Sequence, residues 1–185
     1  MILYKPRFRT SPVVYKGHPS AWIGLETIIA DIMVRFKLGS SAALEFGVEY
    51  GFSTSALANY FDKVVGVDTF RGDVHSFEKD DHMAVTAANL ANWPNIELVR
   101  SDFESYILSD TKHYDLIHID IVHLFGSTIA CGDWAIQHAD CVIFHDTVSH
   151  RQVYNAVEAL ATINRCSFYN FPLHHGLGIL TREYA

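Results

Sequence analysis

Long apolar runs and blocks of positive charge are both missing from this 185-residue sequence. No apolar segment approaches the ~20 residues of a membrane-spanning helix, and the opening MILYKPRFRTSP lacks the apolar core and cleavage site of a secretory signal. Asp and Glu number 21 against 14 Lys and Arg, giving a net charge of −7. Lys and Arg form no block longer than two residues. Neither a nucleic acid nor a membrane is therefore expected as a partner.

Cysteine is also scarce. The three cysteines, Cys131, Cys141 and Cys166, are widely spaced and form no CxxC motif. This usage is typical of reduced thiols in a core and favours a cytoplasmic location. Hydrophobic residues make up 49% of the chain and charged residues 19%, the balance of one ordinary globular domain.

The sequence is rich in short apolar runs that alternate with helical patterns. Five runs predict strands: AALEF, KVVGVD, IELVRSD, YDLIHID and CVIFHD. A helical pattern follows each of them, which predicts a mostly parallel sheet covered on both faces. The tail, CSFYNFPLHHGLGILTR, predicts two further strands that close the sheet edge as a hairpin. The predicted class is an α/β fold.

The N-terminal part precedes this alternation. Residues 1–19 carry three prolines and no clear period, which indicates an irregular arm. Residues 20–37 carry an apolar helical stripe that includes Trp22 and Ile29, with Ser20 as the expected N-cap. The stripe belongs either to the core, the more usual outcome, or to a homodimer surface. We assign residues 1–40 and the ligand-binding part, residues 41–185, to one domain.

The segment Glu45-x-Gly47-x-x-x-Gly51 joins the first predicted strand of the alternation to a helix beginning at Ser53 or Thr54. The two glycines allow a sharp turn and a close approach to a ligand at the carboxyl end of the sheet. Glu45 is expected to project toward the same cavity. The spacing differs from the G-x-G-x-x-G of dinucleotide sites, and a neighbouring carboxylate suits a ligand with a cationic end.

Acidic residues end the next two strands as well. Asp68 stands where a carboxylate can accept both hydroxyls of a ribose, and Ser101 with Asp102 stands where an adenine amino group could be bound. A purely structural alternative remains open: the glycines form only a tight connection and Asp68 caps the following turn.

In this order, the motifs resemble those of class I S-adenosylmethionine-dependent methyltransferases, over roughly residues 42–180. The resemblance implies a Rossmann-like, seven-stranded sheet with a C-terminal antiparallel hairpin, and S-adenosylmethionine as cofactor. The residues that it implies for cofactor binding are Glu45, Gly47, Tyr50, Gly51, Ser53, Asp68, Thr69, Ser101, Asp102 and Asp120. Replacing Gly47 by a bulky residue is expected to abolish cofactor binding and leave the fold intact.

Two further aspartates, Asp120 and Asp146, end the fourth and fifth strands of the alternation. Neighbouring strands lie ~4.8 Å apart, so the two carboxylates could share a divalent cation such as Mg²⁺. Capping of the helix that begins near Ser149 is an equally good interpretation of Asp146.

Within the superfamily, YDLIHIDIVH followed by ADCVIFHDT is similar to methyltransferase family 24, which includes macrolide-sugar O-methyltransferases and cephalosporin-cluster proteins. The metal site also resembles that of catechol-type O-methyltransferases. The resemblance implies Asp120 and Asp146 as metal ligands, with Thr147 in the place of an asparagine ligand. His123 stands where the catechol-type enzymes have a lysine base, and Ile121 stands where family 24 usually has a glycine. It implies transfer of a sulfonium methyl group to a hydroxyl, with His123 and Asp120 as catalytic residues.

Other histidines are open to several interpretations. His118 alternates within a buried strand and is expected to be a hydrogen-bonded core residue. His145 faces either the cavity or the back of the sheet, and His174 and His175 are expected in a solvated loop. His123, His145 and Asp146 could also form the 2-His-1-carboxylate iron site of an oxygenase, although such sites normally occur on all-β scaffolds.

The sequence thus favours an S-adenosylmethionine-dependent O-methyltransferase that acts on a small-molecule hydroxyl with the help of Mg²⁺. A non-catalytic protein that binds the cofactor is the main alternative, and the glycine spacing argues against a nucleotide-binding oxidoreductase. Three segments are candidates for the acceptor pocket. They are the arm with Tyr4, Phe8 and Tyr15, residues 69–82, and the loop at residues 172–176.

Overall fold

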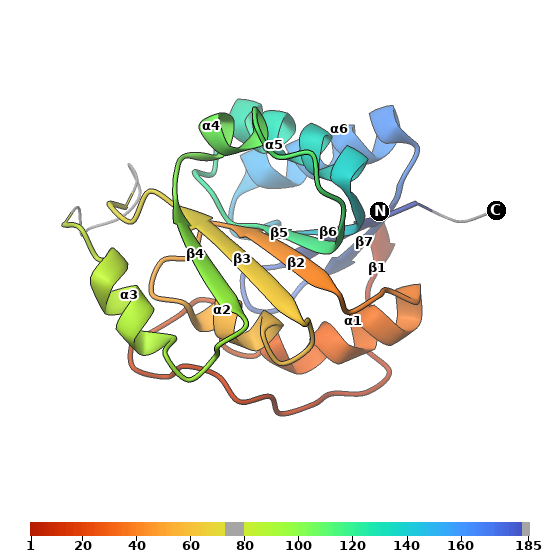
Figure 1. Cartoon of the computed structure of the whole chain (residues 1–185). Coiled ribbons are helices and arrows are strands. Elements are labelled where there is room, and N and C mark those ends of the chain that lie inside the picture. The colour runs from red at the N-terminus through yellow and green to blue at the C-terminus, as the bar shows by residue number, and fades with distance from the viewer. Residues whose placement is uncertain (73–79, 183–185) are drawn as a thin grey trace.

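A computed structural model describes residues 1–72 and 80–182, in which strands form a single sheet between two layers of helices (Figure 1). The strands are β1 (Ile2–Leu3), β2 (Ala42–Phe46), β3 (Lys63–Asp68), β4 (Ile96–Arg100), β5 (Tyr114–Ile119), β6 (Ala139–His145), β7 (Ser167–Phe171) and β8 (Leu177–Thr181). The helices are α1 (Ile29–Phe36), α2 (Phe52–Leu57), α3 (Met83–Asn89), α4 (Phe103–Ile107), α5 (Phe125–His138) and α6 (Arg151–Asn164).

The sheet has the order β1-β7-β8-β6-β5-β2-β3-β4. Its neighbouring strands are parallel except at β8, which runs antiparallel to β6 and to β7. This confirms the predicted α/β class and the C-terminal antiparallel hairpin. The predicted number of seven strands is wrong, because Ile2 and Leu3 pair with β7 and add an eighth strand to the described part of the chain. Two residues are too few to produce a strand period in the sequence.

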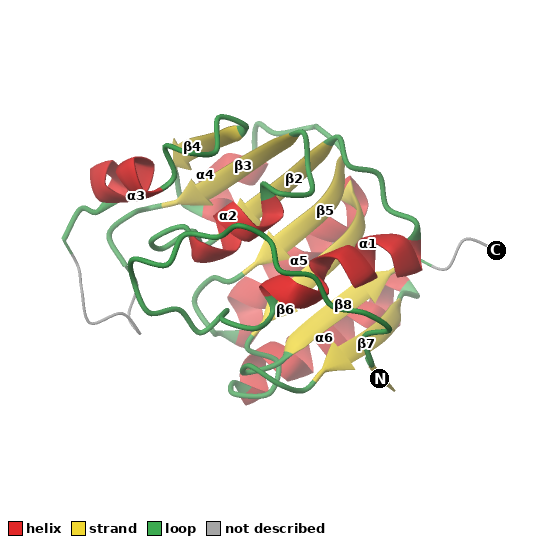
Figure 2. Ribbon diagram, turned by 90° about the horizontal axis from the view of Figure 1, so that it is seen from below, coloured by secondary structure: helices red, strands yellow, loops and turns green. Residues whose placement is uncertain are grey.

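Each face of the sheet carries its own apolar core. Helices α4, α5 and α6 cover one face, and α1 and α2 cover the other (Figure 1). The N-terminal arm crosses the face of α1 and α2, as the view from below shows (Figure 2). Tyr4, in the arm, and Trp22, just after it, are buried in the core beneath these helices.

The N-terminal helix begins later than expected. Residues 21–25 form turns, a 3₁₀ helix covers Glu26–Ile28, and α1 follows. The hydroxyl of Ser20 accepts a hydrogen bond from the backbone N–H of Trp22 at 3.2 Å, so it caps a turn and not a helix. Gly24 has a φ of 104°, which is incompatible with a continuous helix. The apolar stripe itself is core, since both Trp22 and Ile29 are buried.

Candidate functional site

A cavity of about 690 Å³ opens at the carboxyl ends of the parallel strands. The segments that line it are the loop after β2, the ends of β3, β5 and β6, and part of the N-terminal arm. Ligands of doubly wound α/β proteins bind in this position. Of the predicted cofactor and metal residues, those that line the cavity are Gly47, Tyr50, Ser53, Asp68, Thr69, Ser101, Asp102, Asp120 and Asp146; the predicted base His123 does so too.

The glycine turn brings the loop after β2 against the end of β5. Gly47 has a φ of 91°, and a Cβ atom there would lie 1.8 Å from the carbonyl oxygen of Asp120. Gly51, with a φ of 92°, precedes α2 and is packed against Leu90, outside the cavity lining. A side chain at Gly47 would thus collide with backbone, so the structure predicts that a bulky residue there disturbs the fold as well as cofactor binding.

Asp68 holds the turn in place. One carboxylate oxygen accepts hydrogen bonds from the backbone N–H groups of Val48 and Glu49 at 2.8 and 2.9 Å, and the other accepts one from Phe70 at 2.7 Å. A carboxylate offers about four acceptor positions, so the three bonds leave room for a further donor. Asp68 is therefore both a structural residue and an edge of the cavity.

Asp102, like Asp68, both stabilises the local structure and lines the cavity. It is the N-cap of α4, and its carboxylate accepts a hydrogen bond from the backbone N–H of Ser105 at 2.6 Å. This bond holds the pKa of Asp102 below its ordinary value. Ser101 and Asp102 both line the cavity, where the resemblance places an adenine ring.

Glu45 does not border the cavity, contrary to the sequence-based expectation. Its side chain is fully buried, accepts a hydrogen bond from the hydroxyl of Thr54, and lies 2.8 Å from Nδ1 of His118. The indole N–H of Trp22 donates to Nε2 of the same histidine at 3.2 Å. His118 is thus the hydrogen-bonded core residue that was expected, and Glu45 is its partner below the cavity.

Thr147 is also turned away from the predicted metal edge. Its hydroxyl donates a hydrogen bond to the side-chain oxygen of Asn170 at 2.7 Å, and its exposed fraction is 2%. Because that hydroxyl is buried against β7, Thr147 does not join Asp120 and Asp146. The prediction of Thr147 as the third metal ligand is therefore wrong.

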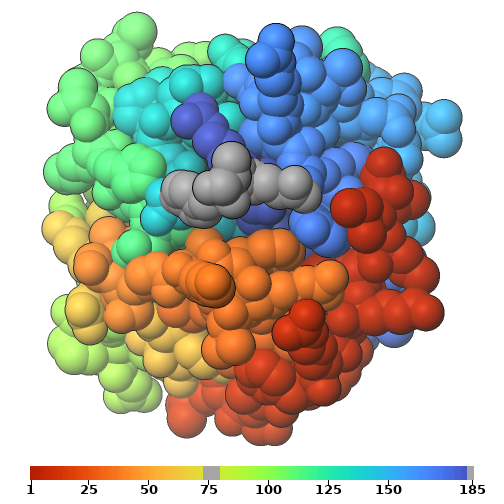
Figure 3. All heavy atoms as spheres, turned by 90° about the vertical axis from the view of Figure 1, so that its right-hand side faces the viewer, coloured from red at the N-terminus to blue at the C-terminus, as the bar shows by residue number. Residues whose placement is uncertain are grey.

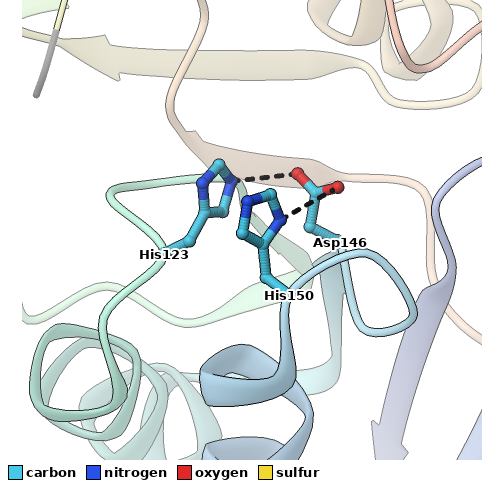
Figure 4. Close-up of side chains that lie close together, drawn as sticks. All are labelled: His123, Asp146 and His150. Carbon is cyan, nitrogen blue, oxygen red and sulfur yellow. Dashed lines mark ion pairs between the residues drawn. The ribbon is translucent and has the colours of Figure 1, made fainter. Parts of the chain in front are cut away.

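Asp120 and Asp146 instead meet histidines. Nε2 of His123 lies 2.9 Å from Asp146 and 3.7 Å from Asp120. Nδ1 of His145 lies 3.1 Å from Asp120 and 3.3 Å from Asp146. His145, which the sequence left open, faces the cavity. His150 stacks on His123 and lies 3.6 Å from the other oxygen of Asp146 (Figure 4).

These carboxylates and imidazoles shift one another's pKa values. Burial alone would lower the pKa of His123, but the hydrogen bonds and charges of Asp120 and Asp146 outweigh it and raise the pKa to about 9. Burial likewise opposes the charged form of His145, yet the same two carboxylates raise its pKa to about 10. The histidines in turn hold the pKa values of Asp120 and Asp146 well below the ordinary range, against the effect of burial.

Asp146 does not cap α6. His150 is the N-cap residue, with no side-chain cap hydrogen bond, and the Asp146 carboxylate instead accepts a hydrogen bond from the hydroxyl of Ser149. The φ of Asp146 is 62°, a left-handed conformation that β-branched and bulky residues rarely adopt. In this backbone conformation, the Asp146 carboxylate faces His123 and His145.

Two sets of donor atoms could hold a metal ion in the described ranges 1–72 and 80–182. They are His123 with Asp146 and His150, and Asp120 with His145 and Asp146. The alternative 2-His-1-carboxylate set of His123, His145 and Asp146 is not among them. Sequence reasoning missed His150 because it precedes α6 and follows no strand.

The arm lines the cavity through Tyr15, which belongs to a predicted acceptor segment, and through His18, to which the sequence gave no role. His18 stacks on Tyr50 with ring centroids 3.9 Å apart, and the Tyr15 hydroxyl lies 2.8 Å from Nδ1 of His18. Tyr15 and His18 line the cavity, together with Trp22.

Of the proposed acceptor segments, Tyr4 is buried in the core and Phe8 is exposed, while residues 73–79 lie outside the described part. His174 and His175 are exposed, as expected.

The described lining of the cavity is strongly acidic. Its carboxylates belong to Glu49, Asp68, Asp102, Glu104, Asp120 and Asp146, and it includes neither Lys nor Arg. Burial and the charges of Asp120 and Asp68 raise the pKa of Glu49, which reflects the concentration of negative charge. Such a cavity favours a cationic ligand over a phosphate-bearing one.

The strand order, the glycine turn and the acidic cavity agree with what the resemblance to class I S-adenosylmethionine-dependent methyltransferases implies. The model of methyltransferase family 24, described as a methyltransferase domain, matches residues 44–147, and the chain belongs to this family. No curated protein matches the sequence.

Solved structures share the fold at low sequence identity. A Klebsiella pneumoniae protein described as an O-methyltransferase is 16% identical with a TM-score of 0.68, over 91% of this chain and 83% of that one. The Bacillus cereus O-methyltransferase, solved in complex with SAH, is 16% identical with a TM-score of 0.63, over 90% and 83%. The N-methyltransferase NodS from Bradyrhizobium japonicum is 15% identical with a TM-score of 0.56, over 80% and 90%.

Within residues 1–72 and 80–182, every helix is too short or too polar to cross a bilayer.

Proposed function

We propose that the protein transfers the methyl group of S-adenosylmethionine to a hydroxyl group of a small molecule, with the assistance of a divalent metal ion. The observation that carries the proposal is the position of Asp120, His123 and Asp146 at the rim of the cofactor-type cavity. The O-methyltransferase names of the Klebsiella and Bacillus proteins support oxygen as the acceptor atom.

The residues present fit this cofactor. A sulfonium and an ammonium group both carry positive charge, and the described cavity lining is acidic without a Lys or Arg. Gly47, Tyr50 and Asp68 would border the cofactor, with Ser101 and Asp102 beside its adenine. The cofactor supplies the methyl group as a sulfonium that an oxygen nucleophile attacks in line. Positioning is the main contribution of the protein to such a transfer.

The acceptor hydroxyl must lose a proton, and His123 is the proposed base. Its pKa, raised to about 9, means that it carries a proton at neutral pH as long as Asp120 and Asp146 are uncompensated. A divalent cation on the two carboxylates would remove this stabilisation, acidify a bound hydroxyl and leave the imidazole able to accept the proton. Mg²⁺ is the ion that the sequence alone favours.

The side chains in and next to the N-terminal arm favour a small and neutral acceptor. Tyr15, His18 and Trp22 form an aromatic and imidazole edge of the cavity. A phosphate or carboxylate on the acceptor would meet the acidic lining, so an uncharged hydroxyl compound is favoured.

A non-catalytic cofactor-binding role is the second candidate, because Thr147 does not complete the expected set of metal ligands.

Calorimetric titration of the full chain with S-adenosylmethionine and S-adenosylhomocysteine, with and without a divalent ion, tests the proposal. Hydroxylated acceptors are then screened for release of S-adenosylhomocysteine. Asp120→Asn should abolish turnover and leave cofactor binding measurable, while Asp140→Asn, at an exposed His–Asp pair, should change neither. Failure of both compounds to bind would reject the cofactor assignment, and binding without turnover on any acceptor would favour the non-catalytic role.

A further inference from the structure

The two candidate metal sets overlap at Asp146. In each of them the donor atoms lie within 4.8 Å of one another. One set contains two histidines and one aspartate, and the other contains one histidine and two aspartates. A single ion can use Asp146 in only one of these arrangements at a time, so the geometry of the remaining donors decides between them.

The set of His123, Asp146 and His150 is poorly arranged for one ion (Figure 4). The two imidazole rings are stacked, with centroids 3.9 Å apart and planes inclined by 13°. The lone pair of an imidazole nitrogen lies in the ring plane, so two nearly parallel rings do not direct their lone pairs at a common point. The His150 side chain is also 41% exposed and lies 3.6 Å from Asp146.

The set of Asp120, His145 and Asp146 is better arranged. Nδ1 of His145 lies 3.1 Å from Oδ2 of Asp120 and 3.3 Å from Oδ2 of Asp146. Neighbouring ligand atoms around an ion with bonds of ~2.1 Å are roughly 3 Å apart, so these separations leave room for such an ion. Asp120 follows β5 and the other two residues lie at the end of β6, on neighbouring strands.

The surroundings of His145 fix its ring for this role. Nε2 lies 3.3 Å from the backbone carbonyl oxygen of His174, so it can donate its N–H to that oxygen. A metal-binding histidine commonly donates its second ring N–H to a carbonyl or carboxylate, which fixes the tautomer and ring orientation. The exposed fraction of the His145 side chain is 1%, so the ring is held among its neighbours.

The absence of Thr147 from the site changes the ligand chemistry. The Thr147 hydroxyl is bound to Asn170 and does not supply the expected oxygen ligand, whereas Nδ1 of His145 lies within 3.3 Å of both carboxylates. Hard ions such as Mg²⁺ prefer an all-oxygen set, while imidazole suits first-row transition metals. One nitrogen among the protein ligands therefore shifts the preference away from Mg²⁺.

We propose that Asp120, His145 and Asp146 bind one divalent transition-metal ion, of the Mn²⁺, Fe²⁺, Co²⁺ or Zn²⁺ class, in preference to Mg²⁺. The role of this ion in methyl transfer rests on the proposed function, but its binding does not. His123, whose Nε2 lies 2.9 Å from Asp146, stays beside the ion as the proposed base.

Titration of the metal-free full chain with Co²⁺, followed by visible absorption, tests this site without any cofactor. One equivalent of Co²⁺ should bind, Zn²⁺ should displace it, and a hundredfold excess of Mg²⁺ should not. His145→Gln should weaken Co²⁺ binding by more than the roughly 10–100-fold that loss of an outer partner costs. His113→Gln is the matched control, because His113 also faces an aspartate, Asp140, at 2.9 Å on the surface.

A directly bound nitrogen gives a second readout. With Mn²⁺ as the probe, pulsed electron paramagnetic resonance should detect ¹⁴N coupling in the unmodified protein, and His145→Gln should remove it. Circular dichroism establishes whether that variant folds. If it does not, the double variant His123→Gln/His150→Gln decides the question: ¹⁴N coupling that persists there comes from His145, and its loss would assign the ion to the other set.

Several results would overturn the inference. They are Mg²⁺ binding as tightly as Co²⁺, unchanged Co²⁺ binding in folded His145→Gln, or no binding of any of these ions. A loss of Co²⁺ binding in His150→Gln larger than that in His145→Gln would assign the ion to the other set, and would also overturn it. Titration with S-adenosylhomocysteine in parallel separates this outcome from failure of the proposed function.

Discussion

Glu45 and His118 face each other across the neighbouring strands β2 and β5, with the Glu45 carboxylate 2.8 Å from Nδ1 of the histidine. Neither side chain is exposed to solvent. Trp22 donates to the other ring nitrogen of His118, and Thr54 of α2 donates to Glu45. Since Trp22 also lines the cavity, these buried hydrogen bonds connect the floor of the site to the sheet and to α2.

Replacing Glu45 by Ala is expected to lower the free energy of unfolding by about 3–5 kcal/mol, because it leaves His118 and Thr54 without an acceptor in a dry interior. Glu45→Gln should cost less, since it keeps one acceptor. Urea denaturation measures both. Glu97→Ala is the matched control: its partner Lys63 lies 2.7 Å away, but both side chains are more than half exposed. A loss no larger for Glu45→Ala than for Glu97→Ala would contradict this account of the network.

Gly47→Ala should destabilise the fold and weaken cofactor binding together. Left-handed backbone strain alone costs about 1–3 kcal/mol, and the added Cβ would also press on the carbonyl oxygen of Asp120. Gly126→Ala is the control, since a Cβ there meets nothing within 4 Å and lies in the first turn of α5. That change should be neutral or stabilise the protein by up to about 1 kcal/mol. Equal unfolding midpoints for the two variants would show that the turn tolerates a side chain.

Asp68→Asn should weaken binding of S-adenosylhomocysteine about tenfold or more. The variant keeps one acceptor oxygen in place of two, so the loop at Val48 and Glu49 loses hydrogen bonds to a charged group worth about 1.5–3 kcal/mol each. Isothermal titration calorimetry measures the affinity. Asp62→Asn, the same change at an exposed position before β3, is the control. Unaltered affinity in Asp68→Asn would show that Asp68 does not contribute to cofactor binding.

Acid sensitivity should depend partly on Asp110. Burial would raise its pKa, but the hydroxyl of Tyr114 at 2.5 Å and the backbone N–H of Lys112 at 2.9 Å hold the pKa below its ordinary value. A carboxylate with a depressed folded pKa stabilises the fold above its unfolded pKa of about 3.9, and this contribution disappears as the pH falls toward the folded value.

Thermal unfolding between about pH 3 and pH 7 measures this effect. The melting temperature of the unmodified protein should fall more steeply below about pH 4 than that of Asp110→Asn, which has no proton to gain there. Tyr114→Phe, which removes the strongest donor, should flatten the curve in the same direction. Parallel curves for all three proteins would show that other carboxylates control the acid transition.

The fold was predictable because its signals are local. Each apolar run that became β2 to β6 is followed by a helical pattern, and such alternation has few topological solutions. The start of α1 was not predictable from the apolar stripe, because Gly24 takes a left-handed conformation that the period does not reveal. β1 was missed because it exists only through its pairing with β7.

The sequence was enough to predict which residues lie at the edge of the sheet that forms the site. Asp68, Asp102, Asp120 and Asp146 end successive strands, and parallel strands bring their carboxyl ends together. The direction of a side chain was harder to predict, because it depends on partners distant in sequence. Thr147 turns to Asn170, and Glu45 turns to His118.

The strand β1 gives the first residues of the chain a protective role at the sheet edge. Ile2 and Leu3 pair with Tyr169 and Asn170, and the backbone N–H of Tyr4 donates to Asn170 at 2.8 Å. Segments from the two ends of the chain thus meet at one side of the molecule (Figure 3). Without them β7 would present unpaired backbone groups, the template on which strands of separate molecules join. Deletion of these few residues would therefore expose the protein to aggregation.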